Sequence, residues 1–227
     1  MELWHVIYRG VEGRSIFMDD QDRGRFVHDL FEFNDMVPAQ EYQRVIRARS
    51  SPAPHVGRAT SHMREKVVDL HGWKLMKNHA HLILSERTEG GLSLFSRKMS
   101  GYGRYFNERH GRRGTLLDRT KKVRIERPEH FLYILHYVHL NGLDDFPGAE
   151  GWRVRDAGTV ADAQAAIAHL KEDRWSSFRD YCGIHNVPSI LTKSLFEEAP
   201  GTYERELREY LHEREPDAMV RYNFEWV

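Results

Sequence analysis

Two histidines separated by one residue are the sharpest chemical signal in the sequence. His79 and His81 flank Ala80 and precede the apolar run Leu82–Leu84. On a β-strand, residues two apart project to the same face, about 6.5 to 7 Å apart at the backbone. The two imidazoles then either converge on one metal ion or form a polar strand face. The apolar run that follows favours a central strand, with Ala80 turned to the opposite side.

A second candidate set lies further along the chain, on a segment with helical periodicity. Tyr133, Tyr137 and Asn141 are spaced by four residues and therefore share one helix face. A tyrosine hydroxyl beside a metal can act as a nucleophile, and an amide oxygen one turn away can complete the metal shell. The alternative is that both tyrosines are core residues whose hydroxyls are hydrogen-bonded.

The elements that would position these residues begin with a strand over residues 3–9, which is rich in aromatic and β-branched side chains. An amphipathic helix is predicted over 19–34, because apolar residues between 26 and 33 fit one helix face and the acidic start complements the helix dipole. Strands are predicted over 67–76 and 79–85, with Lys77-Asn78 as the hairpin turn between them.

A second helix and a further strand complete the predicted pattern. Apolar residues at three- and four-residue spacing predict a helix over 92–110, followed by a strand over 123–126. Pro128 then begins a third helix that ends near Gly142. The order βαββαβ plus a helix predicts an α+β fold of the ferredoxin-like or split-βαβ type, an antiparallel sheet with helices on one face.

The chain divides into a main domain and an extension. Residues 1–143 hold the predicted sheet and the candidate site, interrupted by a basic insertion at about 37–66 that is either a solvated loop or a nucleic-acid-binding arm. Residues 144–227 form a glycine-containing connector and a helical C-terminal extension. The extension ends in an acidic segment over 197–225, with nine acidic residues against four arginines.

Charge is distributed unevenly along the chain, although 34 Lys and Arg balance 34 Asp and Glu. The segment 104–127 holds nine basic and three acidic residues, next to the aromatic residues 102, 105 and 106. This basic band is either a solvated loop or a surface that contacts phosphates and stacks bases. Its candidate DNA-binding residues are Arg104, Arg112, Arg113, Arg119, Lys121, Lys122 and Arg124.

Composition excludes several classes of protein. Apolar residues make up 40% of the 227, which is enough for a core and excludes a fully disordered chain. A single cysteine, Cys182, excludes an intramolecular disulfide and a cysteine-built metal site. Apolar runs are short and no basic-then-apolar leader precedes the first strand, so we expect a cytoplasmic protein that is neither exported nor membrane-spanning.

Three motifs in the same order resemble those of a known family. Leu75–Leu82 resembles its metal motif, Tyr137–Asn141 its tyrosine-helix motif, and His5–Gly10 its first strand. The family is the IS200-like Y1 transposases, which are HUH single-strand DNA endonucleases, and the resemblance is closest to the REP-associated tyrosine transposases. It covers residues 3–143, and Trp175–Phe178 resembles that subgroup's C-terminal extension more loosely.

The resemblance implies a metal-dependent endonuclease and strand transferase acting on single-stranded DNA. Tyr137 would cut a phosphodiester, leaving a 5′-phosphotyrosine link and a free 3′-OH. His79, His81 and Asn141 would hold a divalent ion, Mg²⁺ or Mn²⁺. The expected partner is DNA with imperfect hairpins of the repetitive extragenic palindrome (REP) type, and a monomer is favoured over a homodimer on subgroup analogy.

Two positions depart from the family pattern, since the family often has proline where this chain has Lys77 and Gly142. Neither position supplies a ligand or nucleophile, so the expected chemistry is unaffected. The basic insertion is the larger departure, and it bears on the choice of DNA.

Three other functions fit parts of the sequence. A non-catalytic, domesticated hairpin-binding protein would keep the fold and lose turnover, although His79, His81 and Tyr137 are intact. A histidine-based phosphoesterase would need a second His-x-Ser/Thr motif, or a third histidine where this chain has Ile83. A zinc-stabilised structural domain usually has four ligands, which are often cysteines, and this chain has a single cysteine.

Overall fold

The computed structural model describes residues 1–37, 64–149, 152, 160–196 and 201–212. The predicted basic insertion lies almost entirely outside these ranges, and so does most of the acidic end of the chain.

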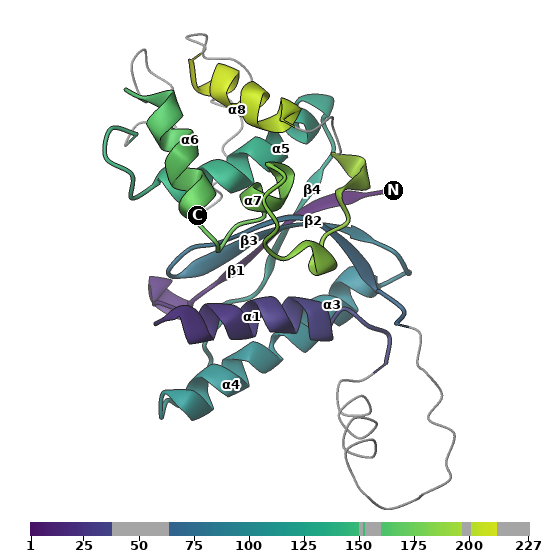
Figure 1. Ribbon diagram of the computed structural model, residues 1–227. Helices are drawn as coiled ribbons and strands as arrows, with labels where there is room; N and C mark the ends of the chain where they lie inside the picture. Colours follow the sequence, from purple (N-terminus) through teal and green to yellow (C-terminus); the bar gives the residue numbers. More distant parts are fainter. Residues whose placement is uncertain (38–63, 150–151, 153–159, 197–200, 213–227) are drawn as a thin grey trace, which may run out of the picture.

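Four antiparallel strands form the sheet at the centre of the molecule (Figure 1). They are β1 (Leu3–Arg9), β2 (Val68–Leu75), β3 (His79–Glu86) and β4 (Lys121–Ile125), in the spatial order β2-β3-β1-β4. A tight turn joins β2 to β3, where Met76 N–H donates to the His79 carbonyl at 2.8 Å. This order is that of the ferredoxin-like fold, and it makes β3 a central strand, as the apolar run after His81 predicts.

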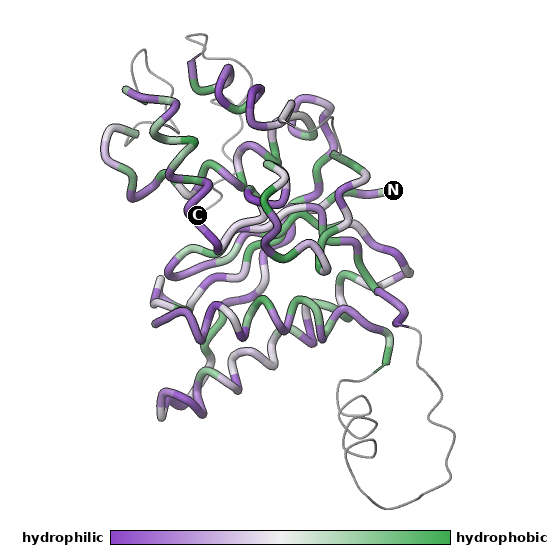
Figure 2. Tube along the Cα trace, viewed as in Figure 1, coloured by the Kyte–Doolittle hydropathy of each residue, from purple (hydrophilic) through white to green (hydrophobic). Residues whose placement is uncertain are grey.

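Three helices cover one face of the sheet: α1 (Asp20–Glu32), α3 (Gly91–Met99) and α4 (Gly101–Arg109). The Asp19 carboxylate caps α1 by accepting from the backbone N–H groups of Gln21 and Asp22. Apolar side chains from the helices and the sheet then form one core, in which Phe26 packs against Tyr8. Figure 2 shows apolar residues recurring along α1, and the buried residues of this helix include Phe26, Val27 and Leu30.

The prediction of one continuous helix over 92–110 is wrong in one respect, because this segment forms two helices that meet at Ser100. Ser100 N–H donates to the Arg97 carbonyl, and Gly103 N–H to the Ser100 carbonyl, which tightens the chain at the junction. A Cβ at Gly101 would lie 3.2 Å from the Phe33 ring, so packing against the end of α1 holds the bend close.

The opposite face carries α5 (Pro128–Leu140) and the helices of the C-terminal extension. Ile83 from the sheet, Val138 from α5, Leu170 from α6 and Leu207 from α8 share a second apolar core. The predicted α+β sheet is therefore confirmed. The prediction placed the helices on one face of the sheet. Helices α1, α3 and α4 lie on one face, but α5 and the helices of the extension cover the other face. The other helices are η1 (Val11–Gly13), η2 (Asn141–Leu143), α6 (Ala163–Glu172), α7 (Phe178–Tyr181), η3 (Pro188–Ile190), η4 (Lys193–Leu195) and α8 (Thr202–His212).

None of the helices within the described ranges combines the length and the apolar character needed to cross a membrane.

Candidate active site

His79 and His81 lie on the face of β3 that α5 covers. Ala80 and Leu82, which alternate with them, pack instead into the core beneath α1, as the strand periodicity predicts. In the sheet register His81 is opposite Ile7 of β1 and Lys74 of β2. The histidine pair therefore lies in the middle of the sheet rather than at its edge.

The two imidazoles point toward each other. His79 Nε2 and His81 Nε2 are 2.9 Å apart, and the ring centroids are 4.7 Å apart. Each remaining ring nitrogen also has a partner. His79 Nδ1 lies 2.6 Å from Asn78 Oδ1, and His81 Nδ1 lies 2.8 Å from His5 Nε2.

These contacts restrict which nitrogens carry protons. Asn78 Oδ1 can only accept, so His79 Nδ1 carries a proton, and in the neutral ring its Nε2 presents a lone pair. If His81 is protonated on Nε2, it donates directly to His79. If His81 is protonated on Nδ1 and donates to His5, two lone pairs face each other at 2.9 Å, an arrangement that a cation between them stabilises.

His5 is a site residue that the analysis of sequence spacing did not single out. Its side chain is fully buried beside His81, with the two rings stacked at 5.0 Å. Burial lowers the pKa of His5 to about 3, with smaller contributions from the charges of His79 and Lys121. A neutral imidazole at this position orients His81 as an outer hydrogen-bond partner orients a metal ligand.

The donor set fits a divalent ion only if other ligands join the histidines. Among the residues that the structure describes, no three His, Cys, Asp or Glu side chains group into a metal site. Two nitrogens bound to one ion at about 2.0 to 2.1 Å lie at most about 4.2 Å apart, and the His79–His81 nitrogens satisfy this limit. The imidazole pair is therefore compatible with one ion, whose remaining ligands would be an amide, water or substrate oxygens.

Tyr137 projects from α5 onto the histidines. Its ring lies 5.8 Å from the rings of both His5 and His81, edge to face, and 6.0 Å from Trp152. The side chain is 6% exposed. Helix α5 approaches the sheet closely because β2 has a glycine beneath it, where a Cβ at Gly72 would lie 2.8 Å from Leu135 Cδ1.

Asn141 and Tyr133 differ in their relation to this group. Asn141 caps the end of α5, is 1% exposed, and donates from Nδ2 to the Tyr137 carbonyl at 2.6 Å. A metal bond from Asn141 would therefore have to use Oδ1. Tyr133 packs against Tyr210 of α8 with centroids 5.7 Å apart. The structure thus brings Tyr137 to the histidines, whereas Tyr133 contacts the extension.

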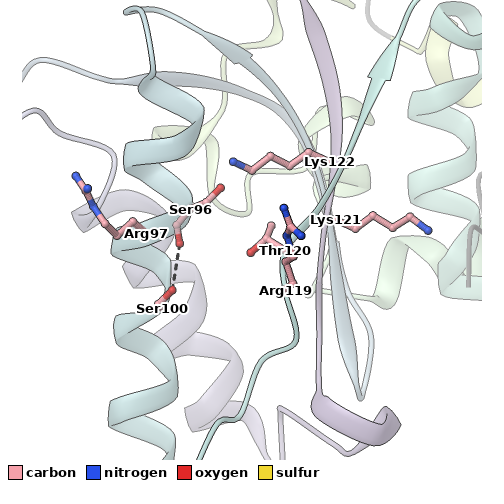
Figure 3. Close-up of a pocket in the computed structure, with 7 residues that line it drawn as sticks. All are labelled: Ser96, Arg97, Ser100, Arg119, Thr120, Lys121 and Lys122. Carbon is pink, nitrogen blue, oxygen red and sulfur yellow. Dashed lines mark hydrogen bonds between the residues drawn. The ribbon is translucent and has the colours of Figure 1, made fainter.

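A basic pocket of about 690 Å³ lies between α3 and β4 (Figure 3). Three predicted DNA-binding residues line it, Arg119, Lys121 and Lys122, together with Arg97, which the sequence analysis did not select. Figure 3 shows Lys122 reaching toward Ser96 and Lys121 extending to the other side of the strand. Because successive strand residues alternate, β4 carries cations on both faces of the sheet.

The other predicted DNA-binding residues lie around the same region. Arg104 lines a neighbouring pocket of about 560 Å³, and Arg113 is exposed in the loop after α4. Arg112 donates to Asn107 Oδ1 and to the carbonyls of Gly114 and Thr115, so it closes that loop. Arg124 forms ion pairs with Glu2 and Glu126.

Comparison with solved structures finds a similar chain, whereas the other comparisons find none. No protein-family model matches the chain, and no curated protein matches it. A structure described as a REP-associated tyrosine transposase bound to a REP hairpin is 13% identical, covers 88% of this chain and 90% of its own, and superposes with a TM-score of 0.44.

Proposed function

We propose that this protein is a metal-dependent single-stranded DNA endonuclease and strand transferase that cuts at hairpins through a 5′-phosphotyrosine intermediate. One observation carries the proposal. Tyr137 lies beside a histidine pair whose Nε2 atoms converge to 2.9 Å and whose outer nitrogens are held by Asn78 and His5. The motif resemblance supports the same reading.

In the proposed reaction the Tyr137 oxygen attacks the scissile phosphorus. The bond from tyrosine oxygen to phosphorus forms, the bond to the 3′ oxygen breaks, and the phenolic proton leaves while the 3′ oxygen gains one. A free phenol ionises near pH 10, so only about one in a thousand is charged at pH 7 and the site has to orient the hydroxyl. A divalent ion, Mg²⁺ or Mn²⁺, supplies positive charge at the nonbridging phosphate oxygens.

The residues of this chain provide the remaining parts. His79, His81 and Asn141 would hold the ion, and His5 would fix the orientation of His81. The ring of Tyr137 contacts that of His81 within the same chain, and we expect a monomer rather than a homodimer. Residues 1–143 would carry the chemistry, and 144–227 would form the extension.

The DNA partner would lie along the basic band. Arg119 and Lys122 in the α3–β4 pocket are suited to phosphate contacts. Lys121 lies on the other face of β4, which is the face of the sheet that holds Tyr137. Arg104 and Arg113 would extend this surface. We expect Arg112 and Arg124 to contribute less, because local acceptors already engage them.

The test is a denaturing-gel assay with single-stranded hairpin oligonucleotides labelled at the 3′ end, since the downstream fragment keeps the 5′-phosphate that joins the tyrosine. We expect a protein-linked band in Mg²⁺ or Mn²⁺ that is lost with chelator, in Tyr137→Phe and in His79→Ala. Tyr133→Phe is the matched control and should keep the band. Tight binding without an adduct would instead indicate a non-catalytic hairpin-binding protein. If the protein neither binds the hairpin nor forms an adduct, both functions are overturned.

A further inference from the structure

A buried polar network joins the tyrosine helix to the sheet through the C-terminal extension. His139 of α5 lies 2.7 Å from the Ser177 hydroxyl through Nε2 and 2.6 Å from the Tyr203 hydroxyl through Nδ1. Ser177 also accepts from the Trp73 backbone N–H on β2 at 2.9 Å. Since His139, Ser177 and Tyr203 are all buried, each of these hydrogen bonds replaces contact with water.

Both ring nitrogens of His139 have a hydrogen-bond partner in this network. His139 is fully buried, and its neutral form satisfies both of these contacts. Either Ser177 donates to Nε2 while Nδ1 donates to Tyr203, or Tyr203 donates to Nδ1 while Nε2 donates to Ser177. In the second case the Ser177 hydroxyl can donate to the Trp73 carbonyl at 3.2 Å.

Ser177 is itself fixed on the edge of β2. Leu75 N–H donates to the Trp175 carbonyl, and Ser177 N–H donates to the Trp73 carbonyl, both at 2.9 Å. An isolated antiparallel bridge pairs Ser176 with Lys74, the residue directly opposite His81. The extension therefore pairs with the outer edge of β2, the strand that neighbours the histidine pair on β3.

The position of His139 on α5 relates its hydrogen bond with Ser177 to the placement of Tyr137 and Asn141. His139 lies two residues after Tyr137 and two before Asn141, about 200° around the helix from each. Its hydrogen bond to Ser177 thus holds the side of the helix away from Tyr137. Rotating or sliding α5 would break that bond and move both site residues relative to His81.

We propose that Ser177 is a positioning residue, which sets the rotation of α5 and thereby the place of Tyr137 and Asn141 over His81. This inference rests on the proposed function, and it makes the C-terminal extension an essential part of the catalytic unit. Misplacing a reacting group by about 1 Å can cost on the order of 100-fold in rate. Loss of the Ser177 hydroxyl should therefore slow adduct formation by about 10- to 100-fold.

Ser176 provides a matched control on the same segment. It is also buried, but its hydroxyl accepts from Phe178 N–H at 3.1 Å and so acts within the extension. Ser176→Ala and Ser177→Ala each remove one buried hydroxyl from neighbouring positions. Only the second removes a hydrogen bond to α5.

The experiment compares the two variants with the unmodified full chain in two readouts. One is the single-turnover rate of adduct formation with saturating 3′-labelled hairpin DNA and Mn²⁺, with hairpin affinity measured alongside. The other is amide hydrogen exchange over residues 137–141 in the protein alone. We expect Ser177→Ala to slow the rate by 10-fold or more, keep hairpin affinity within about twofold and speed exchange at 137–141, whereas Ser176→Ala leaves all three within about twofold.

Equal rates in the two variants, or a loss confined to hairpin affinity, would overturn the positioning role. If the unmodified chain forms no adduct, the proposed function fails, and unchanged exchange at 137–141 in Ser177→Ala would separately overturn the inference. Should Ser177→Ala not fold, Tyr203→Phe breaks the same network from α8, and the same comparison with Ser176→Ala decides the question.

Discussion

A buried carboxylate on α1 makes the stability of this protein depend on pH in an unusual direction. Asp29 has no exposed surface, and its Oδ1 accepts from Arg25 Nε at 2.8 Å. Among the described residues Oδ2 has no hydrogen-bond partner. Burial raises the pKa of Asp29 from 3.8 to about 6, and the opposing effect of Arg25 is the smaller one.

The sign and size follow from that pKa. The folded state holds the Asp29 proton more tightly than the unfolded state, so this group stabilises the fold most at low pH and that stability is lost as pH rises through the folded pKa. The difference between the ordinary pKa of 3.8 and the folded pKa of about 6 corresponds to about 3 kcal/mol in total. Between pH 5 and pH 7 the two titration curves give a loss of about 1.3 kcal/mol.

The perturbation is Asp29→Asn, which keeps the shape of the side chain and cannot titrate. Urea unfolding at pH 5, 6 and 7 measures the free energy of unfolding of both proteins. Because they share every other titratable group, the difference between them isolates Asp29. We expect the variant to gain about 1.3 kcal/mol on the parent from pH 5 to pH 7, and a difference that stays constant with pH would refute the reasoning.

Three further predictions concern a buried ion pair, two glycine positions and the proposed metal site. Lys74→Met should lower the free energy of unfolding by about 3 to 5 kcal/mol in thermal or urea melts, because it leaves the largely buried carboxylate of Asp173 unpaired, and adding Asp173→Leu should recover most of the loss; no recovery would contradict this. Gly91→Ala should destabilise by about 1 to 3 kcal/mol, since its Cβ would lie 2.2 Å from a backbone carbonyl oxygen, whereas Gly24→Ala, in open space on α1, should stabilise by about 0.5 to 1 kcal/mol; the opposite ranking in the same melts would show the packing account to be wrong. His5→Phe should weaken Mn²⁺ binding, measured by titration calorimetry, by about 10- to 100-fold, and an unchanged affinity would remove His5 from the site.

Local spacing predicted the parts of the site that depend on one element. The pairing of His79 with His81 follows from strand periodicity alone, and the placement of both on a central strand follows from the apolar run behind them. Four-residue spacing also put Tyr137 and Asn141 on one helix. It did not separate Tyr137 from Tyr133, because which of them meets the sheet depends on how α5 is seated.

Contacts between distant segments were beyond the reach of that reasoning. His5 meets His81 through the register of β1 with β3, a pairing across 76 positions. Ser177 reaches His139 only because the extension docks on the edge of β2. Counting charges likewise could not reveal that Arg109, inside the basic band, is engaged by Asp22 at the start of α1.

The single measurement that bears most directly on the proposed function is peptide mapping by mass spectrometry of the full chain after reaction with hairpin DNA and Mn²⁺, followed by nuclease trimming of the attached strand. The account predicts a nucleotide-phosphate adduct on the peptide that contains Tyr137, attached at that residue. An adduct on Tyr133 or on a serine would contradict the assignment of the nucleophile, and DNA cleavage with no covalent adduct would contradict the phosphotyrosine mechanism itself.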